Sequence, residues 1–251
     1  MIFAVLNLSG NTCKTTNTQS FLLPRIPNCD VIRIETVNND GLSEGEKVTG
    51  KDWATIQEMI YLNDNVILDI GSSNIVPFMD SVKKDKGSHD SIDYFIVPTV
   101  PEEKQIADTA STIDMLIGLG IEPDKIRLIF NKVDEEGTSE TEFAALIKPC
   151  SKIGLNINSV PRLEYTNMFE LLSKTENTMV GCINEDSDYK TLLKEESKAA
   201  IAARKAGDTE AQNMHRYKIS DLTIRQSVQR IANRQSELYD IEFKKLNVNF
   251  D

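Results

Sequence analysis

The sequence predicts an α/β fold, in which a mostly parallel sheet forms the middle of three layers and carries helices on both faces. Two observations indicate this fold. Short apolar runs of strand length alternate with segments of helical periodicity over about the first 165 of the 251 residues. One of these runs, residues 65–70, is almost continuously apolar, as in a strand that is covered on both faces. We therefore expect parallel strands joined by right-handed crossover helices.

The elements are expected in a regular order along the chain. An apolar strand over residues 2–7 leads through a polar loop into a helix over 14–23, which Pro24 and Pro27 end. Another polar loop, with several glycines, spans residues 36–50. The remaining strands are expected over residues 31–35, 65–70, 94–97, 125–130 and 156–160, and the remaining helices over residues 51–62, 75–84, 102–119, 140–147 and 165–173.

The loop after the first strand reads L-S-G-N-T-C-K-T-T and is typical of a phosphate-binding loop, except that Leu8 and Cys13 replace two glycines. Its backbone N–H groups would surround the β- and γ-phosphates of a nucleotide, and the next helix would add its positive end. Lys14 would reach phosphate oxygens, and the Thr15 hydroxyl would bind Mg²⁺. The alternative is an ordinary polar turn. The expected nucleotide contacts here are Ser9, Gly10, Asn11, Thr12, Cys13, Lys14, Thr15 and Thr16.

Carboxyl groups end two of the expected strands, where parallel sheets bind their ligands. Asp69 closes an apolar strand and precedes an Ile-Gly pair, the form of an acid that holds Mg²⁺ beside a phosphate-binding loop. Glu35 ends the second strand and is a candidate ligand of the same metal. Asn38 and Asp40 lie in the following loop and could orient an attacking water. The alternatives are a strand-end cap and solvated loop side chains. The catalytic candidates are Lys14, Asp69, Asn38 and Asp40, and the metal candidates are Thr15, Asp69 and Glu35.

The segment N-K-V-D at residues 131–134 follows another strand and is typical of a base-binding motif. Asn131 would contact the edge of the base. Asp134 in such a motif accepts hydrogen bonds from guanine, so that GTP stands beside ATP as a candidate ligand. A polar strand-to-turn transition is the alternative. Pro161, which follows the strand expected over 156–160, completes the candidate nucleotide contacts.

In these residues the chain resembles the ParA/MinD group of deviant Walker ATPases and, more closely, the StbB-type plasmid stability proteins. Four segments carry the resemblance: N-L-S-G-N-T-C-K-T-T, L-L-P-R-I-P-N-C-D-V-I-R-I-E-T-V-N, N-V-I-L-D-I-G-S-S-N and R-L-I-F-N-K-V-D. The resemblance implies a cytoplasmic, homodimeric switch that binds ATP or ADP with Mg²⁺. It also implies a small plasmid-encoded DNA-binding partner and a role in plasmid stability and DNA segregation. Gly10 to Thr16 match the phosphate loop of the group, Asp69 its metal-binding acid and Asn131 its base contact.

Three positions depart from the pattern of the ParA/MinD group. Ser9 replaces a second lysine that reaches the phosphates of the partner subunit, Cys13 replaces a glycine, and Val37 replaces a water-positioning Asp. Loss of a charge-stabilising lysine lowers phosphoryl transfer by orders of magnitude, whereas binding depends more on backbone N–H groups. We therefore expect nucleotide binding with weak or absent hydrolysis. A non-hydrolysing adaptor and a GTP-preferring switch are the alternatives.

The tail of the chain differs in charge and periodicity. Residues 187–251 carry a net charge of +2 and residues 1–186 a net charge of −13. We expect a nucleotide-binding domain over 1–186 and a helical extension over 187–251, broken at Gly207. Basic side chains of this extension could contact DNA phosphates without reading bases, or could simply form the solvated face of a packed helix. The candidates are Arg216, Lys218, Arg225, Arg230 and Arg234.

The bulk composition limits the remaining classes of function. A net charge of −11 argues against nucleic-acid binding by the surface as a whole. The four cysteines have no metal-site spacing and are expected to be reduced thiols in a cytoplasmic protein. The apolar start of the chain is expected to be a strand and not a signal peptide. No stretch approaches 18 uncharged apolar residues, so no membrane span is expected.

Overall fold

The computed structural model describes residues 1–35, 47–85, 87–134 and 136–250. They divide into two compact units. The first unit comprises Met1–Tyr165 together with Tyr239–Asp251, and the second comprises Thr166–Leu238. The domain limits expected from the sequence stay a prediction, because compactness alone does not show where an independently folding domain ends.

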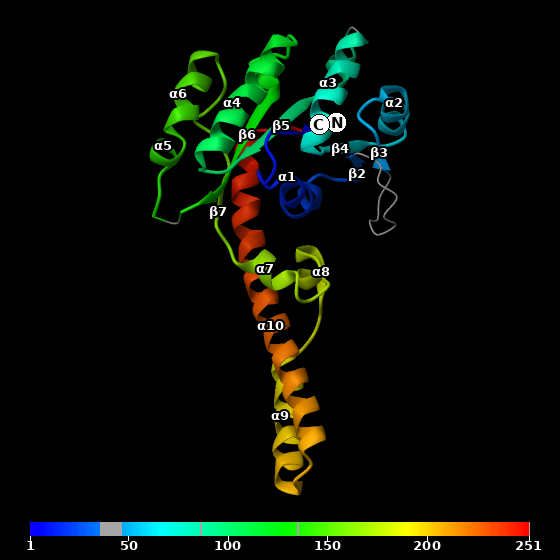
Figure 1. Ribbon diagram of the computed structural model, residues 1–251, viewed down its shortest axis with the longest axis vertical. Coiled ribbons are helices and arrows are strands. Elements are labelled where there is room, and N and C mark those ends of the chain that lie inside the picture. The colour runs from blue at the N-terminus through cyan, green and yellow to red at the C-terminus, as the bar shows by residue number, and fades with distance from the viewer. Residues whose placement is uncertain (36–46, 86, 135, 251) are drawn as a thin grey trace. The chain divides into compact units, whose positions relative to one another are not determined.

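The first unit is built around a parallel sheet of seven strands in the order β3-β2-β4-β1-β5-β6-β7 (Figure 1). The central strand is β1, which pairs with β4 on one side and β5 on the other, so that Val5 lies opposite both Asp69 and Ile96. The carboxyl ends of these strands therefore meet at one edge. The strands are β1 (Ile2–Val5), β2 (Cys29–Ile34), β3 (Lys47–Val48), β4 (Asn65–Ile70), β5 (Tyr94–Thr99), β6 (Ile126–Val133) and β7 (Arg162–Glu164).

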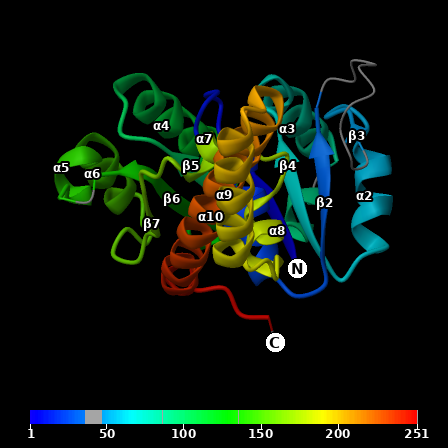
Figure 2. The same ribbon diagram turned by 90° about the horizontal axis from the view of Figure 1, so that it is seen from below.

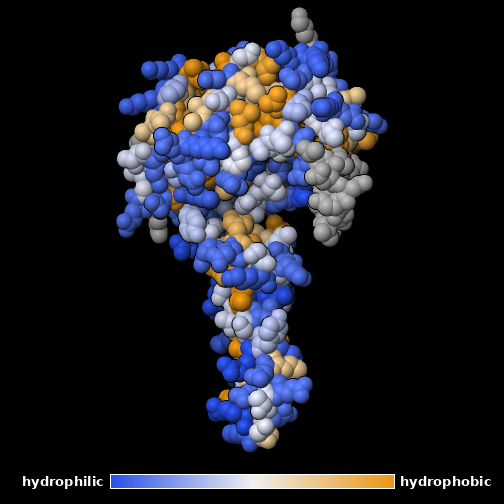
Figure 3. Space-filling view, viewed as in Figure 1, coloured by the Kyte–Doolittle hydropathy of each residue, from blue (hydrophilic) through white to orange (hydrophobic). Residues whose placement is uncertain are grey.

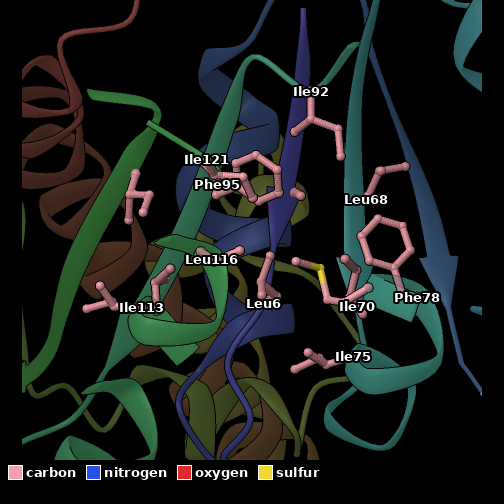
Figure 4. Packing of buried hydrophobic residues seen from close by; sticks show 14 of the residues in the cluster. Leu6, Leu68, Ile70, Ile75, Phe78, Ile92, Phe95, Ile113, Leu116 and Ile121 are labelled. Atoms are coloured by element: carbon pink, nitrogen blue, oxygen red, sulfur yellow. The ribbon is translucent and has the colours of Figure 1, made fainter. Parts of the chain in front are cut away.

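Helices cover one face of this sheet and form the larger hydrophobic core with it. Leu68 and Phe95 point from the strands toward Phe78 of α3 and Leu116 of α4, and all four side chains are fully buried (Figure 4). Burying side chains of this size contributes about 2 kcal/mol each to folding. The helices on this side are α2 (Trp53–Tyr61), α3 (Ile75–Lys84), α4 (Glu103–Gly118) and α6 (Ala144–Lys152), with the short α5 (Ser139–Glu142) before α6.

The opposite face of the sheet is covered by two segments that are far apart in sequence. The first is α1 (Lys14–Thr16) with the π-helical turn Asn17–Leu22 and a 3-10 turn over Leu23–Arg25, and the second is the end of α10. The ring of Phe21 contacts Phe243, with centroids 5.8 Å apart, and Phe250 contacts both Phe243 and Phe3 of β1, each at 6.3 Å. Helices thus lie on both faces of a parallel sheet, and the expected fold class is confirmed.

Three expected elements differ from the structure. The single helix expected over residues 140–147 is divided at Phe143 into α5 and α6. The helix expected over residues 14–23 is α-helical only in its first turn and then widens into the π-helical turn. The strand expected over 156–160 is wrong, because the last strand is Arg162–Glu164. The side chain of Asn156 accepts a hydrogen bond from the backbone N–H of Asn158 (3.2 Å). This local bond favours a turn where the apolar pattern predicts a strand.

The second unit is helical, and a helix hairpin forms most of it. Its elements are α7 (Met168–Leu172), α8 (Met179–Asn184), α9 (Tyr189–Ala206) and α10 (Thr209–Phe243), of which α10 enters the first unit at Tyr239. Gly207, at a φ of 72°, ends α9, and α9 and α10 then run side by side (Figure 2). Between them, Nδ1 of His215 lies 2.6 Å from the Glu196 carboxylate. Most of the hairpin surface visible in Figure 3 is hydrophilic.

No helix in the described parts of the chain combines the length and the apolar character needed to cross a membrane.

Candidate functional site

A pocket of about 570 Å³ lies where the loop after β1 approaches the carboxyl ends of β4, β5 and β6. This volume lies within the range of about 300–1,000 Å³ that is usual for small-molecule sites. Every residue from Gly10 to Thr16 lines the pocket. The structure therefore brings together seven of the eight loop residues that the sequence predicts as nucleotide contacts, all except Ser9. The other lining residues are Ser72, Glu102, Gln105 and Lys132.

The backbone of the loop adopts the left-handed conformation at two positions. Asn11 has a φ of 58° and Cys13 a φ of 64°. Asparagine tolerates this region, but cysteine has no local hydrogen bond that compensates for the contact between its Cβ and the backbone. The sequence pattern has glycine at the position of Cys13, and the structure gives the physical reason: the backbone there needs a positive φ.

Lys14 follows this strained position and begins α1. Its ammonium group donates hydrogen bonds to the backbone oxygens of Asn7 (3.2 Å) and Ser9 (2.7 Å). The Lys14 side chain thus folds back over the loop and closes a ring with the loop backbone. In a phosphate-binding site, such a ring would surround the phosphates. Burial lowers the pKa of Lys14, and the nearby Asp69 carboxylate opposes this shift. An anion in the pocket would favour the charged ammonium still further.

Thr15 and Asp69 meet across the gap between α1 and β4. The Thr15 side chain lies close enough to Asp69 to favour the charged form of its carboxyl group and so to lower its pKa, as do the nearby Arg33 and Lys14. Burial has the larger effect and raises the pKa of Asp69 above its usual value. Two of the three side chains predicted as metal ligands, Thr15 and Asp69, are therefore near each other, and Lys14 is near Asp69.

The Cys13 thiol faces a mixed electrostatic environment. Burial raises its pKa, and the carboxylate of Glu102 adds to this shift. The cations Lys132 and Lys14 oppose it. Two lysines from different elements therefore lie close enough to the loop to influence one thiol. This makes the pocket suitable for a polyanionic ligand.

Asp69 and the other predicted site residues that the structure describes are not among the residues that line this pocket. Ser9 is buried beneath the loop, and Glu35 is half-buried at the end of β2. Asn131 is buried in β6 and its amide donates to the backbone oxygens of Thr99 (3.3 Å) and Ile129 (3.4 Å). The other positions are Asp134, which is exposed, Pro161, whose carbonyl accepts from the Phe130 N–H at 2.9 Å, and Asn38 and Asp40, which fall outside the described residues.

Four pocket residues escape prediction from motifs. Ser72 follows β4, Glu102 and Gln105 lie at the start of α4, and Lys132 lies at a bulge of β6 with a φ of 53°. All four follow or end a strand at the same edge of the sheet. The rule that parallel sheets bind ligands at the carboxyl ends of their strands could have indicated them. Lys132 also lies within the N-K-V-D segment itself.

The basic residues of the tail divide into two groups. Lys218 pairs with Glu196 (3.4 Å) and Arg225 with Asp221 (2.8 Å), so acidic neighbours already balance these two cations. Arg216, Arg230 and Arg234 are exposed on α10. The contact of these five residues with DNA stays a prediction.

Comparison with known proteins leaves the family open. No protein-family model and no curated protein sequence matches the chain. Among solved structures, the chain is similar to apo McdA from Cyanothece (TM-score 0.46, 13% identity, covering 68% of this chain and 88% of that one). It is also similar to the MinD cell division protein of Aquifex aeolicus (TM-score 0.43, 14% identity, covering 67% and 84%). A MinC:MinD complex from the same organism gives a TM-score of 0.46 at 11% identity, covering 69% and 88%. Likeness at this level carries no argument about function.

Proposed function

We propose that this protein is a nucleotide-dependent switch that binds ATP or ADP with Mg²⁺ in the loop pocket and hydrolyses ATP slowly or not at all. The observation that carries the proposal is the pocket lined by the whole loop from Gly10 to Thr16, with Asp69 close enough to Thr15 and Lys14 for all three groups to interact. A hydroxyl, a carboxylate and an ammonium at the start of a helix form the arrangement that a metal-bound phosphate chain requires.

The donor set of this site suits Mg²⁺. In phosphate sites Mg²⁺ is held by one or two protein oxygens, by substrate phosphates and by water, in near-octahedral geometry. Thr15 and Asp69 would supply two such oxygens, and the Lys14 ammonium is close enough to Asp69 to interact with it. When bound, the metal would neutralise phosphate charge. The loop N–H groups would orient the phosphates, and Lys14 and Arg33 would favour the ionised form of the Asp69 carboxyl group against the effect of its burial.

Weak hydrolysis is proposed because the loop lacks a second cation at its start. Ser9 stands at that position, is buried, and does not line the pocket. A positive charge that stabilises the transition state of phosphoryl transfer contributes about 10³–10⁵ in rate. Without it, binding and release of nucleotide, more than turnover, would set the state of the switch.

The biological setting that we propose rests on the resemblance of the motif segments to StbB-type proteins. In that setting the protein acts in the cytoplasm as a homodimer, together with a small plasmid-encoded DNA-binding protein, in plasmid stability and segregation. The exposed arginines of α10 would provide non-specific contacts with DNA.

The proposal is tested by thermal unfolding with ATP, ADP, GTP or GDP, each with and without Mg²⁺. A ligand at 100 times its Kd stabilises the folded state by about 2.7 kcal/mol. We expect this stabilisation from ATP and ADP with Mg²⁺, and its loss in Lys14→Ala. Lys148→Ala, which removes an exposed lysine of α6, is the matched control and should respond like the wild type.

Each other outcome of this experiment favours a specific alternative. Larger stabilisation by GTP and GDP would favour the guanine-binding interpretation of Asn131 and Asp134. No stabilisation by any of the four nucleotides would overturn the switch and favour an adaptor that keeps the loop for structure only. ATP turnover that Lys14→Ala leaves unchanged would also contradict the proposal.

A further inference from the structure

The phosphate-binding loop starts at a buried polar side chain, Asn7, to which the sequence motifs assign no role. Asn7 lies two residues after the end of β1 and is completely buried. Its side-chain amide donates to the Pro98 backbone oxygen (2.9 Å) and to the Thr109 hydroxyl (2.7 Å). Its side-chain oxygen accepts from the backbone N–H of Ser9 (2.8 Å). One side chain therefore joins the end of β5, helix α4 and the backbone of the loop.

Helix α4 supplies two hydroxyls to this arrangement from the same face. The Thr109 hydroxyl also lies within hydrogen-bond distance of the Thr99 hydroxyl (2.9 Å) and the Gln105 carbonyl (2.6 Å). One turn later, the Thr112 hydroxyl accepts from the backbone N–H of Leu8 (3.0 Å). Thr99, Thr109 and Thr112 are all completely buried.

The network extends from the loop to the candidate base contact. The backbone oxygen of Thr99 accepts the side-chain amide of Asn131. Helix α4 also contributes to the pocket itself through Gln105 in its first turn. The same helix therefore lines the pocket, holds the start of the loop, and connects it to β5 and β6.

Packing alone does not account for these hydroxyls. Valine has nearly the shape of threonine and would fill the same space, whereas a buried hydroxyl or amide costs free energy unless it is hydrogen-bonded. Here the polar groups bond to one another and to the loop backbone. Satisfied buried networks of this kind specify one conformation of the groups they hold.

We infer that Asn7 and Thr109 are positioning residues for nucleotide binding. They hold the loop start against α4, so that the N–H groups from Gly10 onward are arranged before the ligand arrives. Neither residue lines the pocket: Asn7 acts through the Ser9 amide, and Thr109 acts through the side chain of Asn7. This inference rests on the proposed function for its effect on affinity, but its effect on the loop exists without a ligand.

The test compares Thr109→Val, which removes the hydroxyl, with Thr109→Ser, which keeps it. Two quantities are measured on the full chain: the Kd for ATP with Mg²⁺ by calorimetry, and amide hydrogen exchange of residues 8–12 without nucleotide. We expect Thr109→Val to weaken binding about tenfold and to accelerate exchange of the Ser9 amide. The reason is that the buried side-chain amide of Asn7, whose oxygen accepts from the Ser9 N–H, loses one of its hydrogen-bond partners. Thr109→Ser should restore both quantities. Ser111→Ala, which removes an exposed α4 hydroxyl bonded to Ala107, is the control and should leave both unchanged.

The possible failures of this test have different meanings. A wild type that binds no ATP overturns the proposed function, while the exchange data still decide whether the network holds the loop. Unchanged exchange in Thr109→Val overturns the inference, whether or not nucleotide binds. Equal loss of affinity in the Val and Ser variants would show that side-chain shape and not the hydroxyl matters, which also overturns it. If Thr109→Val does not fold, Thr112→Val gives the same test through exchange of the Leu8 amide.

Discussion

The rings of Phe21 and Tyr239 meet edge to face, with their centroids 5.3 Å apart. Phe21 lies in the π-helical turn that follows the phosphate-binding loop, and Tyr239 lies near the end of α10. The adjacent Arg25 and Asp240 form an ion pair at 2.8 Å. The end of α10 therefore packs against the π-helical turn Asn17–Leu22, which follows the loop and α1.

Replacing Phe21 should show how much this contact stabilises the first unit. Phe21 is completely buried, and Phe21→Ala leaves a cavity against two aromatic rings. We expect the free energy of unfolding to fall by about 3–5 kcal/mol. Tyr217→Ala, which removes an α10 ring that is 77% exposed, should change it by less than about 0.5 kcal/mol. Urea denaturation measures both, and similar values for the two variants would contradict the assigned packing.

Replacing Cys13 should separate backbone strain from nucleotide fit. Cys13→Gly removes the cost of the left-handed backbone, about 1–2 kcal/mol, but glycine also stabilises the unfolded chain by about 0.5–1 kcal/mol. We therefore expect a small rise in the melting temperature without ligand. Affinity for ATP with Mg²⁺ should rise further, because the Cβ and sulfur leave the pocket wall.

Cys13→Ala is the matched control for this prediction. It removes the sulfur and keeps both the Cβ and the cost of the left-handed backbone. If alanine improves binding as much as glycine does, the sulfur and not the backbone limits the fit. Calorimetric titration of the three proteins gives the comparison.

The raised pKa of Asp69 predicts a pH dependence of stability. Over the interval between the unfolded and the folded pKa, the folded protein binds more protons, so its free energy of unfolding falls as pH rises. Above that interval the buried carboxylate costs stability until Mg²⁺ binds. Asp69→Asn should therefore raise the melting temperature at neutral pH, on the order of 2 °C, and abolish stabilisation by Mg²⁺ with ATP. Asp30→Asn, at an exposed position, should do neither.

The arginines of α10 give a prediction for DNA. Each phosphate contact contributes a slope of about −0.9 to the dependence of log K on log salt concentration. Replacing Arg230 and Arg234 together by Ala should weaken binding to duplex DNA and reduce the slope by about 2. Replacing Lys218 and Arg225, which already pair with acids, should have the smaller effect. Equal effects, or none in either double variant, would place the DNA contact elsewhere.

The sequence predicts well those elements in which the local pattern and the tertiary structure agree. Strand β4 has the same bounds as its apolar run, and helix α3 agrees with its expected range. The neighbourhood of Thr15 and Asp69 was also predictable, because Thr15 lies beyond the end of β1 and Asp69 lies near the end of β4, at the same edge of one parallel sheet.

The features that sequence patterns miss depend on single hydrogen bonds or on distant partners. The side chain of Asn156 accepts a hydrogen bond from the Asn158 N–H and favours a turn there, so that the last strand is Arg162–Glu164 and not residues 156–160. Strand β3 has only two residues and exists because Val48 pairs with β2. In the sequence, Asn7 and Thr109 have the pattern of an ordinary strand-end residue and an ordinary helix residue. Only the fold brings their side chains within hydrogen-bond distance.

The placement of Tyr239 and Phe243 in the first unit has a consequence for the order in which this protein matures on the ribosome. The sheet, the loop and Phe21 belong to the first 165 residues, yet the aromatic surface that covers them is synthesised only after the whole hairpin has emerged. We therefore expect the sides of Phe3 and Phe21 that contact these rings to stay uncovered until residues 239–250 leave the exit tunnel. The loop after β1 would gain this support only at that point.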